Sequence, residues 1–90
     1  MVSTFYQHYQ NLQEQYPDAI VLIRLGDFFE ILGDNARVVA NELDLTLTGR
    51  DCGLKERVPM CGFPYHLKDR YTTALVDKGY KIAIVEELTK

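Results

Sequence analysis

The spacing of apolar residues predicts that the chain begins with an amphipathic helix over residues 4–16. Thr4 and Gln7 have the spacing of a capping box at its start, and Pro17 stops it. The apolar positions that recur at helical spacing are Phe5, Tyr9, Leu12 and Tyr16. We therefore expect one face of this helix to pack on the rest of the domain.

Two strands joined by a tight turn are expected next. Residues 19–25 are apolar on both alternating sets and rich in β-branched side chains, as in a strand that is covered on both faces. Gly26 and Asp27 follow, and a glycine at the first central position suits a two-residue type II′ hairpin turn. Residues 28–32 are thus predicted to return antiparallel to the first strand.

The rest of the chain alternates between helical and extended patterns. The expected elements are a helix over 35–43, a short strand over 45–48, a polar and mobile loop over 49–58, a short strand over 59–63, a helix marked by Leu67, Tyr71, Ala74 and Leu75, and a strand over 81–85. Gly33, Asp34 and Asn35 signal the start of the first of these helices, and Gly79 ends the second as a C′ residue. This order predicts an α/β (α+β) domain in which about three helices pack on a small mixed sheet.

Length and composition place these elements in one domain. The 90 residues are 47% apolar and 26% charged, without a low-complexity segment. The longest apolar run is too short to span a bilayer and no leader-like segment opens the chain, so we expect a cytoplasmic protein with no membrane partner. Cys52 and Cys61 lack the spacing of a metal site and are expected to be reduced thiols. The net charge of −3 argues against tight binding of nucleic acid through charge alone.

The stretch GDFFE raises the question of where its two aromatic rings point. If it enters a strand, Phe28 and Glu30 share one face while Phe29 lies on the other. Because an unpaired carboxylate is costly to bury, we expect the Glu30 face to approach solvent, Phe29 to enter the core and Phe28 to be exposed or half-exposed. The alternative is that Phe28 packs under the first helix or the 49–58 loop and that Glu30 pairs with Arg24.

Three blocks of sequence carry a family signature: YPDAIVLIRLGDFFEILGDNARVVANELDLTLTGR, VPMCGFPYH and LVDKGYKIAIVEEL. The first contains a Gly-Asp-Phe-aromatic-Glu core. In order and approximate spacing, the blocks resemble the N-terminal mismatch-recognition domain (domain I) of the MutS family of DNA mismatch repair proteins. Since they cover nearly the whole chain, the resemblance implies that residues 1–90 are a single such domain, without the connector, core, clamp and ATPase domains of that family.

The resemblance implies that Phe28 and Glu30 bind DNA. In the family, the phenylalanine of Phe-x-Glu inserts from the minor groove and stacks on a mispaired or unpaired base, and the glutamate hydrogen-bonds to that base. Carried to this sequence, Phe28 is the wedge, Glu30 is the hydrogen-bonding residue, and mismatched double-stranded DNA is the partner. The residues that could contact the DNA backbone are Arg50, Lys55, Arg57, Lys68 and Arg70.

No enzymatic activity and no cofactor are expected of the chain itself. It contains no G-x-x-x-x-G-K-[ST] phosphate-binding loop, so the ATP and Mg²⁺ of full-length family members belong to another domain. His8 and His66 have no nucleophile at an instructive spacing. If the protein is longer, the remaining MutS domains and other repair proteins are expected partners.

Two other functions are compatible with the same residues. A protein-interaction module related to MutS would dock the exposed Phe28 into a groove of a protein partner and would no longer bind DNA on its own. A metal-dependent nuclease would use Asp27, Glu30 and Asp34, although their spacing is poor for a metal and no lysine lies nearby.

Overall fold

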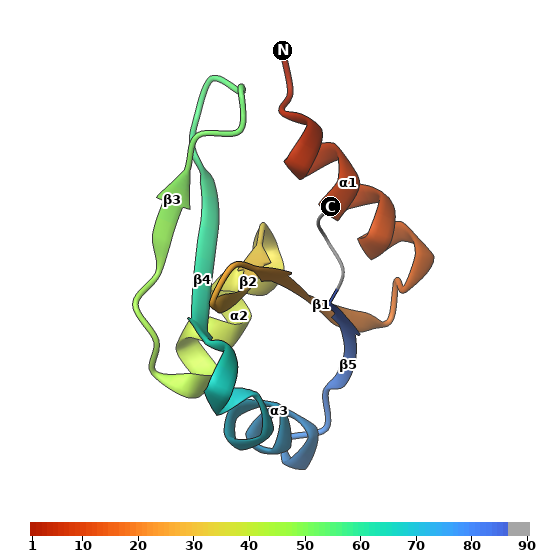
Figure 1. Ribbon diagram of the computed structural model, residues 1–90, viewed down its shortest axis with the longest axis vertical. Coiled ribbons are helices and arrows are strands. Elements are labelled where there is room, and N and C mark those ends of the chain that lie inside the picture. The colour runs from red at the N-terminus through yellow and green to blue at the C-terminus, as the bar shows by residue number, and fades with distance from the viewer. Residues whose placement is uncertain (87–90) are drawn as a thin grey trace.

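A computed structural model describes residues 1–86, in which three α-helices and a short 3₁₀ helix accompany a five-stranded sheet (Figure 1). The elements in chain order are α1 (Thr4–Gln15), β1 (Ala19–Leu25), β2 (Phe28–Leu32), α2 (Asp34–Leu43), β3 (Thr48–Arg50), β4 (Val58–Pro64), η1 (Tyr65–Leu67), α3 (Lys68–Asp77) and β5 (Lys81–Val85). The predicted class, a mixed sheet with packed helices, is confirmed.

The strands are arranged in the order β3-β4-β2-β1-β5, with β1 and β5 parallel and the other neighbours antiparallel. The predicted hairpin joins β1 to β2, and Leu25 pairs with Phe28 across the turn. Gly26 has a φ of 63°, whereas Asp27 is not in the positive-φ region, as a type II′ turn requires. β2 therefore lies inside the sheet, between β1 and β4.

Each face of the sheet has its own apolar core. The cluster under α2 and α3 consists of Ile20, Leu22, Phe29, Ile31, Ala36, Val39, Ala40, Cys61, Phe63 and Leu75. The cluster under α1 consists of Tyr9, Val21, Ile23, Leu32, Cys52 and Val58. β1 supplies residues to both clusters, which explains why its two alternating sets are apolar, and Figure 1 shows α1 on one side of the β1–β2 hairpin with α2 and α3 on the other.

The predicted strand over residues 45–48 is wrong in its position, because β3 covers Thr48–Arg50. The chain leaves α2 through Asp44, whose φ is 57°, and the Leu45 amide donates to the Ala40 carbonyl. Leu45 then packs against the cluster under α2 and α3. The alternating pattern thus marks a segment that completes the end of a helix, and the strand begins only after it.

The predicted loop over residues 49–58 is confirmed at its centre and wrong at both ends, because β3 extends to Arg50 and β4 begins at Val58. Cys52 is fully buried, and its carbonyl accepts a hydrogen bond of 2.8 Å from the Ser3 amide. The Gly53 amide donates to Asp51 Oδ1 at 3.0 Å. The sequence of this segment is polar and lacks periodicity, but a hydrogen bond from the distant N-terminus of the chain holds it in place.

Local capping is partly as predicted. The N-cap of α1 is Ser3, whose Oγ accepts a hydrogen bond from the Tyr6 amide, so the proposed capping box of Thr4 and Gln7 is wrong by one residue. Gly79 follows the C-cap of α3 with a φ of 96°, as predicted for a C′ glycine.

Both cysteines are free and buried, as expected of reduced thiols. Cys61 Sγ donates to the Ala36 carbonyl, and burial raises the pKa of this thiol to about 11. Within residues 1–86, no helix has the length and apolar character needed to cross a bilayer.

The two phenylalanines of β2 are expected to differ sharply in their effect on stability. Phe29→Ala should lower the free energy of unfolding by about 3–5 kcal/mol, because it empties a fully buried site. Phe28→Ala should change it by about 0.5 kcal/mol or less, because the ring is exposed. Urea unfolding of both variants measures the difference, and equal losses would contradict the assignment of the two rings to opposite faces.

Candidate functional site

β2 places its two neighbouring phenylalanines on opposite faces of the sheet. Phe29 is completely buried, with its ring centroid 6.0 Å from that of Phe63 and 5.6 Å from that of Tyr65. Phe28 is 43% exposed. The predicted division between the two rings is confirmed, and the alternative in which Phe28 is packed under α1 or the 49–58 segment is wrong.

The face that carries Phe28 changes from open to covered along β2. Phe28 is exposed, Glu30 is half-buried and Leu32 is buried in the cluster under α1. α1 therefore covers only the far end of this face, and the end beside the hairpin turn is open. We refer to Phe28, Glu30 and this uncovered surface as the open face.

Glu30 lies over a glycine of the neighbouring strand. Glu30 pairs with Gly62 of β4, and a methyl group at Gly62 would overlap Glu30 Oε1 and lie 2.6 Å from the Phe29 carbonyl oxygen. Gly62 does not have a positive φ, so its role is to leave space rather than to permit a special backbone conformation. Gly62 is not among the predicted site residues, although a glycine inside a predicted strand signals a close approach.

The surroundings of Glu30 favour its neutral form. Burial raises the pKa of this carboxyl, and the positive charge of Arg50 opposes the shift. None of the ion pairs between residues 1–86 includes Glu30. Arg50 pairs with Val58 of the cluster under α1, so it lies on the same face, where its Cζ is 4.5 Å from the centre of the Phe5 ring.

Arg24 is not the partner of Glu30. It pairs with Phe29 across the hairpin and therefore lies on the opposite face. Its Cζ is 3.4 Å from the centre of the Tyr65 ring, and its Nε donates to the Gly26 carbonyl at 2.9 Å. The predicted ion pair of Arg24 is wrong, because strand register sends its side chain away from the carboxylate.

The remaining candidate cations fall into two groups. Lys55 and Arg57 are exposed between β3 and β4, and Arg57 Nη2 donates to the Gly49 carbonyl at 2.7 Å. Lys68 and Arg70 belong to α3, which lies at the other end of the molecule in Figure 1. The five positively charged residues that were predicted as possible contacts to the DNA backbone therefore do not form one continuous patch.

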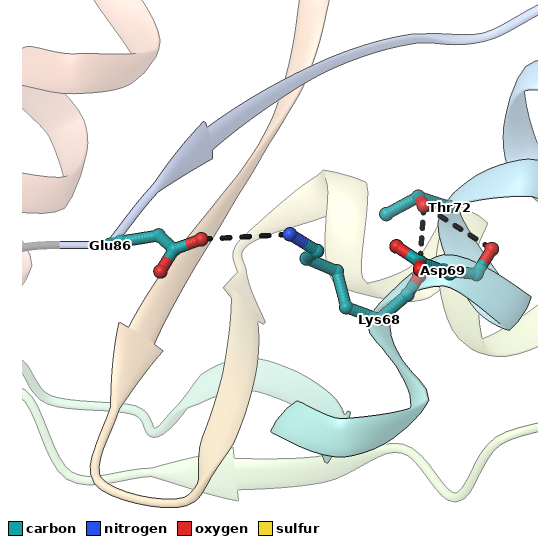
Figure 2. Close-up of polar contacts among 4 residues, drawn as sticks. All are labelled: Lys68, Asp69, Thr72 and Glu86. Carbon is teal, nitrogen blue, oxygen red and sulfur yellow. Dashed lines mark hydrogen bonds and ion pairs between the residues drawn. The ribbon is translucent and has the colours of Figure 1, made fainter.

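The two cations of α3 are engaged with neighbouring side chains. Lys68 Nζ lies 3.6 Å from Glu86 Oε2, and Figure 2 shows this ion pair reaching from the start of α3 to the residue after β5. The Arg70 Cζ is 5.6 Å from the centre of the Tyr71 ring. Of the five cations, Arg50 is the one that lies on the same face of the sheet as Glu30.

The carboxylates of the nuclease hypothesis are not brought together. Asp27 lies in the hairpin turn, Glu30 in the middle of β2 and Asp34 at the start of α2. Over residues 1–86, no three His, Cys, Asp or Glu side chains form a group that could hold a metal ion. The geometry thus favours the binding hypotheses over metal-dependent cleavage.

Comparison with known proteins identifies the family. A family model described as MutS domain I matches residues 3–90. The chain belongs to the MutS domain I family. In this MutS domain I, the motif GDFFE forms the hairpin turn and the start of β2, while the block VPMCGFPYH forms β4 and most of η1. The two motifs meet where Glu30 lies over Gly62.

Relatives of this MutS domain I are named DNA mismatch repair protein MutS. The protein of Ruminiclostridium cellulolyticum is 52% identical over 87 residues, which are 97% of this chain and 10% of the relative. The protein of Acetivibrio thermocellus is 52% identical over 82 residues, 91% of this chain and 9% of the relative. The protein of Synechococcus sp. is 50% identical over 88 residues, 98% of this chain and 10% of the relative. The chain thus spans about a tenth of the length of these relatives.

Glu30→Gln is expected to stabilise the fold at alkaline and neutral pH. Because burial raises the pKa of Glu30, the folded state holds its proton more tightly than the unfolded state, and the wild type loses stability as pH rises through the folded pKa. Glutamine carries no charge and avoids this loss. The difference in melting temperature between variant and wild type should therefore be larger at about pH 8 than at about pH 4.

Glu14→Gln is the matched control for that experiment, since it removes an exposed carboxylate from α1. It should leave the difference from the wild type nearly constant over the same pH range. A Glu30→Gln curve parallel to that of the wild type would contradict the burial of the charged group.

Proposed function

We propose that this domain detects mispaired or unpaired bases in double-stranded DNA, as one domain of a longer DNA mismatch repair protein. The observation that carries the proposal is an aromatic ring, 43% exposed, beside a half-buried carboxylate at the open end of one sheet face. Membership of the MutS domain I family and the names of the relatives support it.

Phe28 suits the role of a wedge because its backbone is rigid while its ring is free. It pairs with Leu25 on one side and with Pro64 on the other, so the strand that carries it is supported on both edges. Inserting an apolar ring between base steps costs about a few kcal/mol of lost stacking. Stacking of a base on the ring returns about 1–3 kcal/mol. A mispaired base is already poorly held, so insertion is more favourable at a defect than in intact duplex.

Glu30 suits the role of discriminating between bases. In its charged form it accepts a hydrogen bond from a base N–H, and in its protonated form it donates one to a purine nitrogen. Burial already raises its pKa, and the phosphates of a bound duplex would favour the proton further. A charged carboxylate near phosphates also disfavours tight binding to undamaged duplex.

The proposed backbone contacts are Arg50, Lys55, Arg57, Lys68 and Arg70. Arg50 is the strongest candidate, because it lies on the same face of the sheet as Phe28 and Glu30, while Lys68 would have to share its charge with Glu86. With a net charge of −3, the domain would bind DNA weakly and in a manner sensitive to salt. Specificity would thus come from the wedge and the carboxylate, with affinity supplied by other parts of a longer protein.

Phe28→Ala is expected to abolish the preference for mismatched over matched duplex. Loss of the ring removes about 1–3 kcal/mol of base stacking that is available only at a defect. Fluorescence anisotropy at low salt, with a duplex containing one unpaired thymine and its matched counterpart, measures this preference. The same substitution is then measured in the MutS protein of R. cellulolyticum with this chain in place of its own domain I, where affinity is higher.

Tyr16→Ala is the matched control, because Tyr16 is 46% exposed and lies at the end of α1, away from the hairpin turn. It should leave the preference unchanged. A preference that survives Phe28→Ala would contradict the proposal. Flat titrations with both duplexes at high protein concentration would contradict it for the chain alone and favour the protein-interaction module.

A further inference from the structure

Both carbonyl groups of the hairpin turn before Phe28 are held by hydrogen bonds. Arg24 Nε donates to the Gly26 carbonyl at 2.9 Å, and the Tyr65 amide donates to the Asp27 carbonyl at 2.7 Å. One donor comes from β1 and the other from η1, so the turn is tied at two points to elements on different sides of it.

The two donors are also joined to each other and to the core. The guanidinium of Arg24 lies on the Tyr65 ring, with its Cζ 3.4 Å from the ring centre, at a distance typical of a cation–π contact. The Tyr65 ring is in turn 5.6 Å from the buried ring of Phe29. A continuous series of contacts thus runs from the core through Tyr65 and Arg24 to the turn. We call Arg24 and Tyr65 the turn clamp.

The position of the turn matters because Phe28 follows it directly. Phe28 is the first residue of β2, and the end of a hairpin is where a strand pair opens most easily. A ring that must insert between bases binds more weakly if its backbone has to be ordered at the same time, since that ordering opposes binding. Any loosening of the turn would therefore act on the wedge.

We propose that Arg24 is a positioning residue for mismatch recognition, acting through the turn clamp to hold Phe28 in the orientation needed for insertion. This inference rests on the proposed function of Phe28. It requires no contact between Arg24 and DNA, because the Arg24 side chain lies on the face opposite Phe28 and Glu30. The Tyr65 ring stacks on the Arg24 guanidinium. The Tyr65 hydroxyl makes no hydrogen bond to the turn within residues 1–86.

Arg24→Lys separates this role from a simple charge effect. Lysine keeps the charge but loses the Nε donor and the planar group that stacks on the ring. We expect exchange of the Phe28 amide, and of the Tyr65 amide that donates to the Asp27 carbonyl, to become about five-fold faster or more in the free chain. The preference for a duplex with an unpaired thymine over the matched duplex should fall by a similar factor. This factor lies within the range of about 5- to 150-fold that corresponds to the loss of one stacking interaction of about 1–3 kcal/mol. The slope of affinity against salt should stay unchanged.

Two control variants are matched to the clamp. Arg37→Gln removes an exposed arginine of α2, outside the turn and outside the proposed DNA contacts. Tyr65→Phe keeps the ring and the backbone amide. Neither should change exchange at the turn or the preference for the unpaired base, and urea unfolding establishes that every variant is folded.

The outcomes distinguish the clamp from the proposed function on which it rests. If Arg24→Lys behaves like the wild type while Arg24→Gln weakens binding to both duplexes equally and lowers the salt slope by about one, Arg24 is a phosphate contact and the clamp is overturned. Unchanged exchange at Phe28 and Tyr65 in Arg24→Lys also overturns it. If the wild type shows no preference between duplexes, the proposed function fails, and the exchange measurement still decides whether the clamp exists.

Discussion

Burial of the Phe29 ring is the interaction on which the rest of the site depends. This ring packs between Phe63 and Tyr65 on the helix-covered face of the sheet, and it therefore determines which way every other side chain of β2 points. A slip of one residue in the register of β2 would bury Phe28 and expose Phe29. Removing the Phe29 ring from the core would cost a large part of the free energy of folding. This cost maintains the register of β2 and so keeps the Phe28 ring exposed. The open face is thus held in place by a contact made on the other side of the sheet.

The open face is built at some expense of stability. Glu30 is half-buried and has no ion-pair partner among residues 1–86, and burial raises the pKa of its carboxyl. Gly62 contributes no side chain to packing, since any side chain would collide with that carboxylate. A core optimised for stability would fill both positions with apolar residues. Departures of this kind from good packing are expected at sites kept for binding.

Much of this arrangement can be predicted from the sequence, because it follows from local rules. The bounds of β1, β2 and β5, the hairpin turn at Gly26 and the division between Phe28 and Phe29 all follow from periodicity, turn chemistry and the cost of burying a carboxylate. What could not be predicted depends on contacts between distant segments. Gly62 meets Glu30 only through the pairing of β2 with β4, and the 49–58 segment is held by Ser3. Spacing along the chain does not show which face of the sheet Arg24 occupies, so it leaves open the alternative of an ion pair with Glu30.

The most direct test of the account is whether the Phe28 ring itself touches the mispaired base. The chain would be prepared with isotope-labelled phenylalanine rings and mixed with an unlabelled duplex that contains one unpaired thymine. We expect intermolecular nuclear Overhauser effects between the Phe28 ring and protons of the unpaired base and its neighbour, none from the Phe29 ring, and none with matched duplex. Bound DNA whose base protons show no contact with the Phe28 ring would contradict it.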